Sequence, residues 1–249
     1  MLKSARHTQI RKLVEANGHV TVGELKRVLG VSKATIRRDL DIMAQSGWIR
    51  RTHGGAVSVE HTSHEPPIIH RQSEYHSEKQ LIGRQAATLV CEGETIFLGS
   101  GTTVHEVARN VRDVPGLTVI TNALNVVNEL VECENIELIV IGGMFRQSEL
   151  SMVGHVAEQA IREFRADKVI MGMRGLDPVH GLTSDYMPEA VTDRAILSIA
   201  PCNIIVADHS KLGRVSSVFL APITSAHVLI VDQGAPAQIV SEIRELGLE

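Results

Sequence analysis

One short segment has the composition of a phosphate-binding loop. The residues "GSGTT" at 99–103 follow an apolar run and precede a helical pattern. Glycines let backbone N–H groups approach an anion, the helix dipole favours negative charge, and Ser100, Thr102 and Thr103 add hydroxyl donors. The segment lacks the lysine of a Walker loop and the third glycine of a dinucleotide-binding fingerprint. Taken alone, it is equally consistent with a tight strand-to-helix turn capped by threonine.

Four further polar segments follow apolar runs later in the chain. They are "TNAL" at 121–124, "GGMFR" at 142–146, "GLDPVHGLTSD" at 175–185 and "ADHSKLG" at 207–213. Amides and an ammonium are suited to phosphate, whereas carboxylates and side-chain amides are suited to hydroxyl groups. Any one of these segments could be an ordinary turn, but five in succession favour a cleft for a phosphorylated polyhydroxy ligand.

A different chemistry is indicated near the N-terminus, where "VSKATIRRDL" at 31–40 places two arginines side by side. At helical spacing Ile36 and Leu40 form part of an apolar stripe, which leaves Arg37 and Arg38 pointing outward. An α-helix fits the major groove of DNA, and arginine can donate two hydrogen bonds to guanine. The alternative is a solvated helix face.

Three helical patterns and a strand pair surround these arginines. A helix is expected over 4–17, and a second one follows Thr21, which forms a capping box with Glu24. Ser32 then caps the arginine-bearing helix, and "WIRRTHGGAV" at 48–57 has the alternation of a β-wing. We therefore predict a winged helix-turn-helix. Its expected DNA contacts are Ser32, Lys33, Thr35, Arg37, Arg38, Arg50, Arg51 and His53.

Charge is distributed unevenly along the 249 residues. Residues 1–58 hold 11 Lys and Arg against 4 Asp and Glu, a net of +7, and the remaining residues hold 14 against 25, a net of −11. A basic unit joined to an acidic one is expected where only one end of a protein meets a polyanion. A chance fluctuation of surface charge is the alternative.

Composition narrows the class of protein further. No apolar run approaches the length needed to cross a bilayer, and the N-terminus lacks the apolar core of a secretion signal. The three cysteines suit a reduced compartment, so we expect a cytoplasmic protein with no membrane partner. The histidines at 57–76 match no zinc-ligand spacing, and we expect neither a metal site nor a cofactor.

From about residue 78 short apolar runs alternate with amphipathic segments. Strands are expected at 95–98, 117–121, 136–141, 168–171, 203–207 and 227–231. Helices are expected near 78–91, 103–110, 123–132, 153–164, 188–199 and 236–246. This alternation predicts an α/β fold with a mostly parallel, helix-covered sheet, on which ligands bind beyond the carboxyl ends of the strands. The expected domains are a winged helix-turn-helix at 1–58, a linker at 59–77 and an α/β effector-sensing domain at 78–249.

Both halves of the sequence resemble the DeoR family of bacterial transcriptional regulators. The segment "SKATIRRDLDIMAQSGWIRRTHGGA" at 32–56 is similar to the family signature S-x-x-T-I-R-R-D-L, followed by a glycine and a basic wing that ends in H-G-G-A. In the second half the G-T-T, T-N, G-G, G-L-T and D-x-S-K elements match, as does Glu189. The resemblance implies a sensor domain similar in fold to ribose-5-phosphate isomerase. It also implies a repressor whose DNA affinity is changed by a phosphorylated sugar or a related metabolite.

The resemblance further implies roles for residues of the second half, with the G-T-T element on phosphate and Asn122 and Glu189 facing the sugar. The full candidate effector set is Ser100, Gly101, Thr102, Thr103, Asn122, Arg174, Asp185, Glu189, Asp208 and Lys211. Two positions depart from the family. Gly99 stands where many relatives carry aspartate, and Arg174 stands where relatives often carry a small residue. Arg174 could contact an anion, or it could pair with Asp177 or Asp185.

We therefore expect a repressor of a carbohydrate catabolic operon that binds double-stranded operator DNA, a phosphorylated sugar effector and further copies of itself. The alternative is a sugar-phosphate isomerase-like enzyme with an accessory DNA-binding domain, in which Glu189 or Asp208 would act as general base. A signature that makes sense only on DNA, and the lack of a clear acid–base pair, favour the regulator. Closure of the sensor cleft would then reposition the DNA-reading domains of an oligomer.

Overall fold

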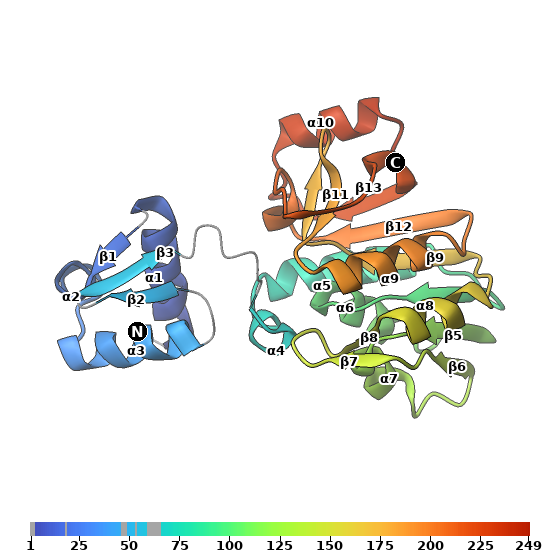
Figure 1. Cartoon of the computed structure of the whole chain (residues 1–249), viewed down its shortest axis with the longest axis horizontal. Helices are drawn as coiled ribbons and strands as arrows, with labels where there is room; N and C mark the ends of the chain where they lie inside the picture. The colour runs from blue at the N-terminus through green and yellow to red at the C-terminus, as the bar shows by residue number, and fades with distance from the viewer. Residues whose placement is uncertain (1–2, 18, 46–48, 53, 59–65) are drawn as a thin grey trace. The chain divides into compact units, whose positions relative to one another are not determined.

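The computed structural model describes residues 3–17, 19–45, 49–52, 54–58 and 66–249. The chain divides into two compact units, Met1–Pro66 and Pro67–Glu249, each with its own hydrophobic core (Figure 1). None of the helices in the described ranges combines the length and the apolar character that crossing a bilayer requires.

The first unit is a winged helix-turn-helix. Its elements are α1 (Lys3–Asn17), β1 (His19–Thr21), α2 (Val22–Leu29), α3 (Lys33–Gln45), β2 (Ile49–Thr52) and β3 (Gly55–Ser58). The expected capping box of α2 is present, because the Thr21 side chain accepts from the Glu24 amide while Glu24 accepts from the Thr21 amide. Gly30 ends α2 in the left-handed region at φ 67°. Ile10, Leu25 and Ile36 pack where the three helices meet.

The wing has one strand more than the sequence indicated. The three strands form an antiparallel sheet in the order β1-β3-β2, and β1 contains buried Val20, whose neighbour in β3 is Ala56. At the β1–β3 pairing a Cβ added to Gly55 would lie 1.9 Å from the Val20 carbonyl oxygen. Glycine is therefore required there for the two backbones to pair this closely.

The second unit is built on a six-stranded parallel sheet. Its strands are β4 (Thr95–Leu98), β5 (Leu117–Thr121), β6 (Ile136–Val140), β9 (Lys168–Gly172), β12 (Cys202–Ala207) and β14 (Val228–Val231). They lie in the order β14-β12-β9-β4-β5-β6 and pair in parallel throughout. All six expected strands are present, and the mostly parallel α/β architecture is confirmed.

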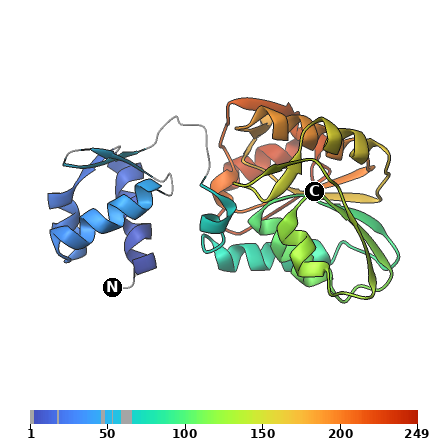
Figure 2. The same ribbon diagram turned by 60° about the horizontal axis from the view of Figure 1, so that its bottom comes forward.

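Helices cover both faces of this sheet. The helices are α5 (His76–Ala87), α6 (Thr102–Val111), α7 (Leu124–Leu130), α8 (His155–Arg162), α9 (Met187–Leu197) and α10 (Ala237–Glu245). Residues of α5, α6 and α7 pack with Ile96 and Leu98, whereas residues of α8, α9 and α10 pack with Phe97 of the same strand. Figure 2 shows the teal and green helices on one side of the sheet and the yellow to red helices on the other.

Several short elements lie in segments that were expected to be loops. They are the β7 (Met144–Arg146) and β8 (Ser151–Val153) hairpin, the β10 (Gly175–Asp177), β11 (Gly181–Ser184) and β13 (Val218–Ala221) sheet, α4 (Ile68–Arg71), and the 3₁₀ turns η1 (His209–Lys211) and η2 (Ile223–Ser225). Of the expected linker, residues 59–65 lie outside the described residues, while α4 and the start of α5 occupy its second half. The domain boundaries at 58 and 78 stay predictions.

Candidate functional site

The first candidate surface is the exposed side of α3 near its N-terminus. Ser32 caps the helix, since its Oγ accepts a hydrogen bond from the Thr35 amide at 3.1 Å. Lys33, Arg37 and Arg38 are exposed. Within the described part of the chain neither Arg37 nor Arg38 has a hydrogen-bond or ion-pair partner. These cations are therefore available to a polyanion.

Asp39 holds the same helix from its other side. Its carboxylate accepts from Arg6 Nε at 2.6 Å and lies 3.0 Å from His7 Nε2, both in α1. The side chain is buried, and although burial raises the pKa of Asp39, the hydrogen bonds from Arg6 and His7 hold that pKa below its usual value. Asp39 thus fixes α3 on α1, while its neighbours Arg37 and Arg38 stay outside.

The wing residues have mixed placements. Arg51 Nε donates to Asp41 at 2.8 Å and its Nη1 donates to the Gly55 carbonyl at 2.6 Å, so this guanidinium braces the wing against the end of α3. The backbone of Arg50 lies in β2. The side chain of Arg50 and the whole of His53 lie outside the described residues.

The second candidate surface lies at the carboxyl edge of the parallel sheet. Gly101 precedes α6 with φ 128°, a conformation that glycine adopts without strain, and it places Thr102 and Thr103 in the first turn. Ser100 is half-buried, whereas the two threonines are buried. The free N–H groups of a helix start and its dipole suit an anion here, as the sequence indicated.

Polar groups of the neighbouring strands surround this helix start. Asn122 Nδ2 donates to the Met152 carbonyl at 2.9 Å, and Asn125 Nδ2 donates to the Gly101 carbonyl at 3.3 Å. The Oδ1 atoms of both asparagines and Ser151 Oγ are buried, and among the described residues they have no hydrogen-bond partner. Buried acceptors without partners are costly, so they mark a place that is suited to the hydroxyl groups of a ligand.

Lys79 of α5 is a cation that the candidate set did not include. Its side chain is buried, with the residue only 4% exposed, and Nζ donates to the Arg71 carbonyl at 2.9 Å. Burial lowers the pKa of Lys79 to about 8, an effect that nearby Asp208 opposes and Lys211 reinforces. These charges show that Lys79, Asp208 and Lys211 lie in one neighbourhood. Asp208 itself caps η1 by accepting from the Ser210 amide at 3.1 Å.

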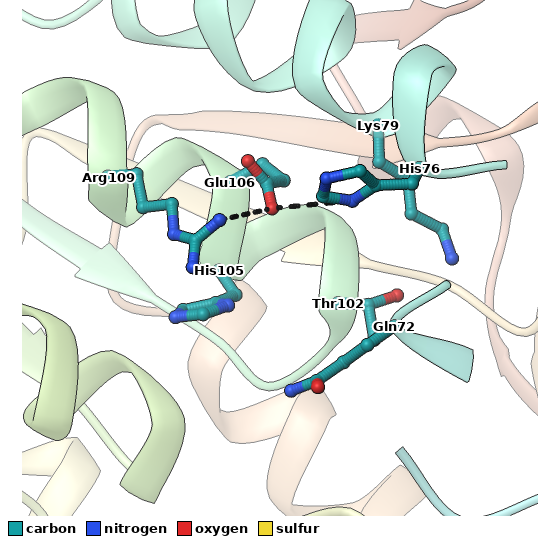
Figure 3. Close-up of a pocket in the computed structure, with 7 residues that line it drawn as sticks. All are labelled: Gln72, His76, Lys79, Thr102, His105, Glu106 and Arg109. Atoms are coloured by element: carbon teal, nitrogen blue, oxygen red, sulfur yellow. Dashed lines mark hydrogen bonds and ion pairs between the residues drawn. The ribbon is translucent and has the colours of Figure 1, made fainter. Parts of the chain in front are cut away.

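A pocket of about 100 Å³ lies beside the first turns of α6. Its lining residues are Gln72, His76, Lys79, Thr102, His105, Glu106 and Arg109. Figure 3 shows Lys79 and Thr102 on one side of the pocket and Arg109 on the other, with Glu106 between them. Glu106 pairs with Arg109 at 3.2 Å and lies 3.9 Å from His76. Its carboxylate makes the Arg109 side less suited to an anion than the Thr102 side.

Arg174 lies at the centre of a buried charge network. Its guanidinium is 2.7 Å from Glu149, 3.1 Å from Asp185 and 3.6 Å from Glu189. Of the two partners expected for Arg174, Asp185 is the one present, because Asp177 instead pairs with His180 at 2.9 Å. Glu149 was not expected at all.

Two further arginines complete the network. Arg146 of β7 pairs with Glu189, lies 3.7 Å from Asp185 and stacks 4.3 Å from the centre of the Tyr186 ring. Arg71 of α4 pairs with Glu149. Burial raises the pKa of Glu189, while Arg174 and Arg146 oppose this shift. Each of the carboxylates Glu149, Asp185 and Glu189 lies beside at least one guanidinium group.

The structure brings most of the candidate effector residues to one edge of the sheet. Gly101, Thr102 and Thr103 lie beside Asn125, and Arg174, Asp185 and Glu189 contact one another. Residues that sequence reasoning missed there are Arg71, Lys79, Asn125, Arg146, Glu149 and Ser151. Arg146 lies in the "GGMFR" segment, and its place in that segment is the only sequence feature that indicated a role at the site.

Comparisons with known proteins match both units. The DeoR-like helix-turn-helix domain matches residues 6–62 and the DeoR C terminal sensor domain matches residues 74–233. Transcriptional repressor AccR of Agrobacterium fabrum is 36% identical over 92% of this chain and 89% of its own. The glycerol-3-phosphate regulon repressor of Escherichia coli K12 is 33% identical over 98% of this chain and 97% of its own. Among solved structures, ribose 5-phosphate isomerase from Plasmodium falciparum is 19% identical to this chain. The match covers 55% of this chain and 52% of that protein, with a TM-score of 0.41.

Proposed function

The chain belongs to the DeoR family of transcriptional regulators, and on that premise we propose that it represses a carbohydrate catabolic operon under the control of a phosphorylated sugar or a related metabolite. Membership makes it a DNA-binding regulator rather than an enzyme. The two carboxylates that could have served as a general base are also engaged in the structure. Glu189 pairs with Arg146, and Asp208 caps η1.

The DNA-binding part of the proposal rests on which side chains of α3 are exposed and which are buried. Arg37 and Arg38 are exposed, and Asp39 beside them is buried and bound to α1. A helix that is held firmly by Asp39 on one side, and whose Arg37 and Arg38 have no ion pair among the described residues, can present these arginines to base edges and phosphates. The excess of positive charge in residues 1–58 supports this role, because it favours association with a polyanion.

The effector part of the proposal rests on the carboxyl edge of the sheet. A phosphate would bind at the start of α6, where the buried cation Lys79 lines the same pocket as Thr102. Hydroxyl groups would donate to Asn122, Asn125 and Ser151, whose buried oxygens lack partners among the described residues. The relative named for the glycerol-3-phosphate regulon supports a phosphorylated polyol as the class of effector. Self-association stays a prediction.

The test uses the full-length protein and random duplex DNA. Fragments that the protein retains are sequenced, and their affinity is measured by fluorescence anisotropy with and without glycerol 3-phosphate, ribose 5-phosphate and the unphosphorylated parent compounds. We expect a phosphorylated compound to change the dissociation constant of the DNA by about fivefold or more, with no change from its parent compound. Failure to select any sequence would contradict the DNA-binding role. Equal effects of the phosphorylated and parent compounds would contradict the effector class.

A further inference from the structure

The first described helix after the connector, α4, is tied to the candidate effector edge by one backbone hydrogen bond, one hydrogen bond from a lysine side chain and one ion pair. The Ile68 amide donates to the Ser148 carbonyl at 2.7 Å, in the loop between β7 and β8. The Arg71 guanidinium pairs with Glu149 in the same loop, and the Arg71 carbonyl accepts from Lys79 Nζ at 2.9 Å. Ile68 and Arg71 are both buried, so α4 is part of the core of the second unit.

Glu149 joins this helix to the loop that follows β9. One of its carboxylate oxygens pairs with Arg71, and the other lies 2.7 Å from Arg174 Nη2. The residue is only 3% exposed. A buried carboxylate whose two oxygens are held by different guanidinium groups fixes how those two groups lie relative to each other. The positions of Arg71 and Arg174 are therefore interdependent.

Arg174 in turn reaches the residues that the proposed function assigns to the effector. Its Nε atom lies 3.1 Å from Asp185 and 3.6 Å from Glu189. A ligand that hydrogen-bonds to either carboxylate competes with Arg174 for the same oxygen atoms. The chain of contacts from the effector edge to α4 therefore runs from Asp185 through Arg174 and Glu149 to Arg71.

We propose that Glu149 is a positioning residue that couples the loops of the effector edge to α4, and thereby to the connector that precedes it. The proposal rests on the proposed function for the nature of the trigger, but the coupling itself is a property of the ligand-free protein. When the loops hold Arg174 in place, Glu149 keeps α4 docked. When Arg174 shifts, the Arg71–Glu149 pair weakens and α4 loosens. The residues before α4 lead along the chain to the DNA-binding unit, so α4 is the element through which a change at the effector edge would reach that unit.

Two contacts of α5 reinforce this coupling. In the structure Lys79 Nζ donates to the Arg71 carbonyl. An anion bound at the start of α6 would attract this ammonium group away from that carbonyl. Tyr75, the residue before α5, packs its ring edge-on against His209 with ring centres 4.6 Å apart, which joins the α4–α5 corner to the loop after β12. Both contacts link the effector edge to the segment 68–79 through residues other than Glu149.

The coupling is tested by hydrogen–deuterium exchange on the full-length protein without ligand. Four proteins are compared, namely the wild type, Arg174→Lys, Glu149→Gln and the double variant. Arg174→Lys keeps the positive charge but cannot span both Glu149 and Asp185. We expect it to speed exchange in the peptide 67–75 about tenfold. In the Glu149→Gln background the same substitution should change exchange in that peptide less than about twofold. Arg165→Lys, a change at an exposed arginine that contacts only nearby carbonyl groups, is the matched control and should have no effect.

Three results would overturn the proposal. They are unchanged exchange in 67–75 after Arg174→Lys, an equal effect of Arg174→Lys in both backgrounds, and a uniform rise in exchange over the whole second unit. A separate arm adds inorganic phosphate to the wild type and follows the peptide 100–106. Slower exchange there supports the anion site at α6, and unchanged exchange contradicts the proposed effector site. The test of Glu149 uses no ligand, so its result does not depend on the outcome with phosphate.

Discussion

Arg6 Nε lies 2.6 Å from Asp39 Oδ2, and this contact joins α1 to α3. Asp39 directly follows Arg38 in the sequence, so the same turn of α3 carries a buried anion inward and exposed cations outward. The ion pair therefore anchors α3 on α1 beside the two exposed arginines. The proposed DNA contacts Arg37 and Arg38 and a buried ion pair of the first unit thus lie in one turn of α3.

Replacement of Asp39 by Asn should destabilise the first unit by about 2 kcal/mol, because the Arg6 guanidinium loses its charged partner. Urea unfolding followed by tryptophan fluorescence would measure the loss, since Trp48 is the only tryptophan of the chain. Asp41→Asn is a suitable control, because the Asp41 side chain is 58% exposed. Equal stability of Asp39→Asn and the wild type would show that the pair contributes nothing.

The difference in free energy of unfolding between the wild type and Asp39→Asn should decrease as the pH falls. Hydrogen bonds from Arg6 and His7 hold the pKa of Asp39 below its usual value, so the folded protein keeps this carboxylate ionised at a pH where the unfolded chain takes up a proton. The stabilisation is fully present above the ordinary aspartate pKa of about 3.9 and is lost as the pH falls through the lower pKa of the folded state. Unfolding curves from pH 7 down to pH 2 should therefore converge. A difference that stayed constant down to pH 2 would contradict this role of the ionised carboxylate.

The two adjacent glycines of the wing should respond differently to the same substitution. A Cβ added to Gly55 would lie 1.9 Å from the Val20 carbonyl oxygen and 2.8 Å from the Thr21 Cα, whereas a Cβ added to Gly54 meets nothing within 4 Å. We expect Gly55→Ala to destabilise the first unit by about 2 to 3 kcal/mol and Gly54→Ala by less than about 0.5 kcal/mol, both by urea unfolding. Similar values for the two variants would contradict the close pairing of β1 and β3.

The sequence predicted the strands of the parallel sheet and missed the short strands in the segments that connect them. Thr95–Leu98 and Leu117–Thr121 have the expected bounds, because central parallel strands read as continuous apolar runs. β7 was missed because Met144 and Phe145 are exposed although they lie in a strand. Its pairing with β8 depends on the turn between them and on tertiary contacts, neither of which gives a period in the sequence.

The charge network around Arg174 was likewise only partly predictable from the sequence. The sequence offered Asp185 as a partner of Arg174, and both lie in the segment that follows the expected strand at 168–171. It could not offer Glu149, which lies 78 residues from Arg71 and joins it to Arg174 only after the hairpin has folded back. Lys79 was missed for a related reason, because its partner is a backbone carbonyl, which has no signature in the sequence.

Binding of inorganic phosphate should weaken between pH 7 and pH 9 because of Lys79. Burial lowers the pKa of this side chain to about 8, so most of its positive charge is lost across that range. If phosphate binds the charged form, the dissociation constant should rise about tenfold from pH 7 to pH 9, measured by isothermal titration calorimetry. Lys79→Met should bind more weakly at pH 7 and show little change with pH. A wild-type affinity that stayed constant over this range would exclude Lys79 from the anion site.

Arg37 and Arg38 should differ in what they contribute to DNA binding, although both are exposed. We expect Arg37→Ala and Arg38→Ala each to weaken binding of a selected duplex by about tenfold or more, while Arg27→Ala, at an exposed position in α2, has a smaller effect. An arginine that binds a base loses discrimination at one position of the site when it is removed, because that contact carries sequence information. An arginine that binds a phosphate leaves the preference unchanged and lowers the salt dependence of binding by about one ion. Anisotropy titrations at several salt concentrations, on the selected duplex and on duplexes with single substitutions, separate the two roles. Equal losses for Arg27→Ala and both α3 variants would show that binding follows net charge rather than the α3 surface.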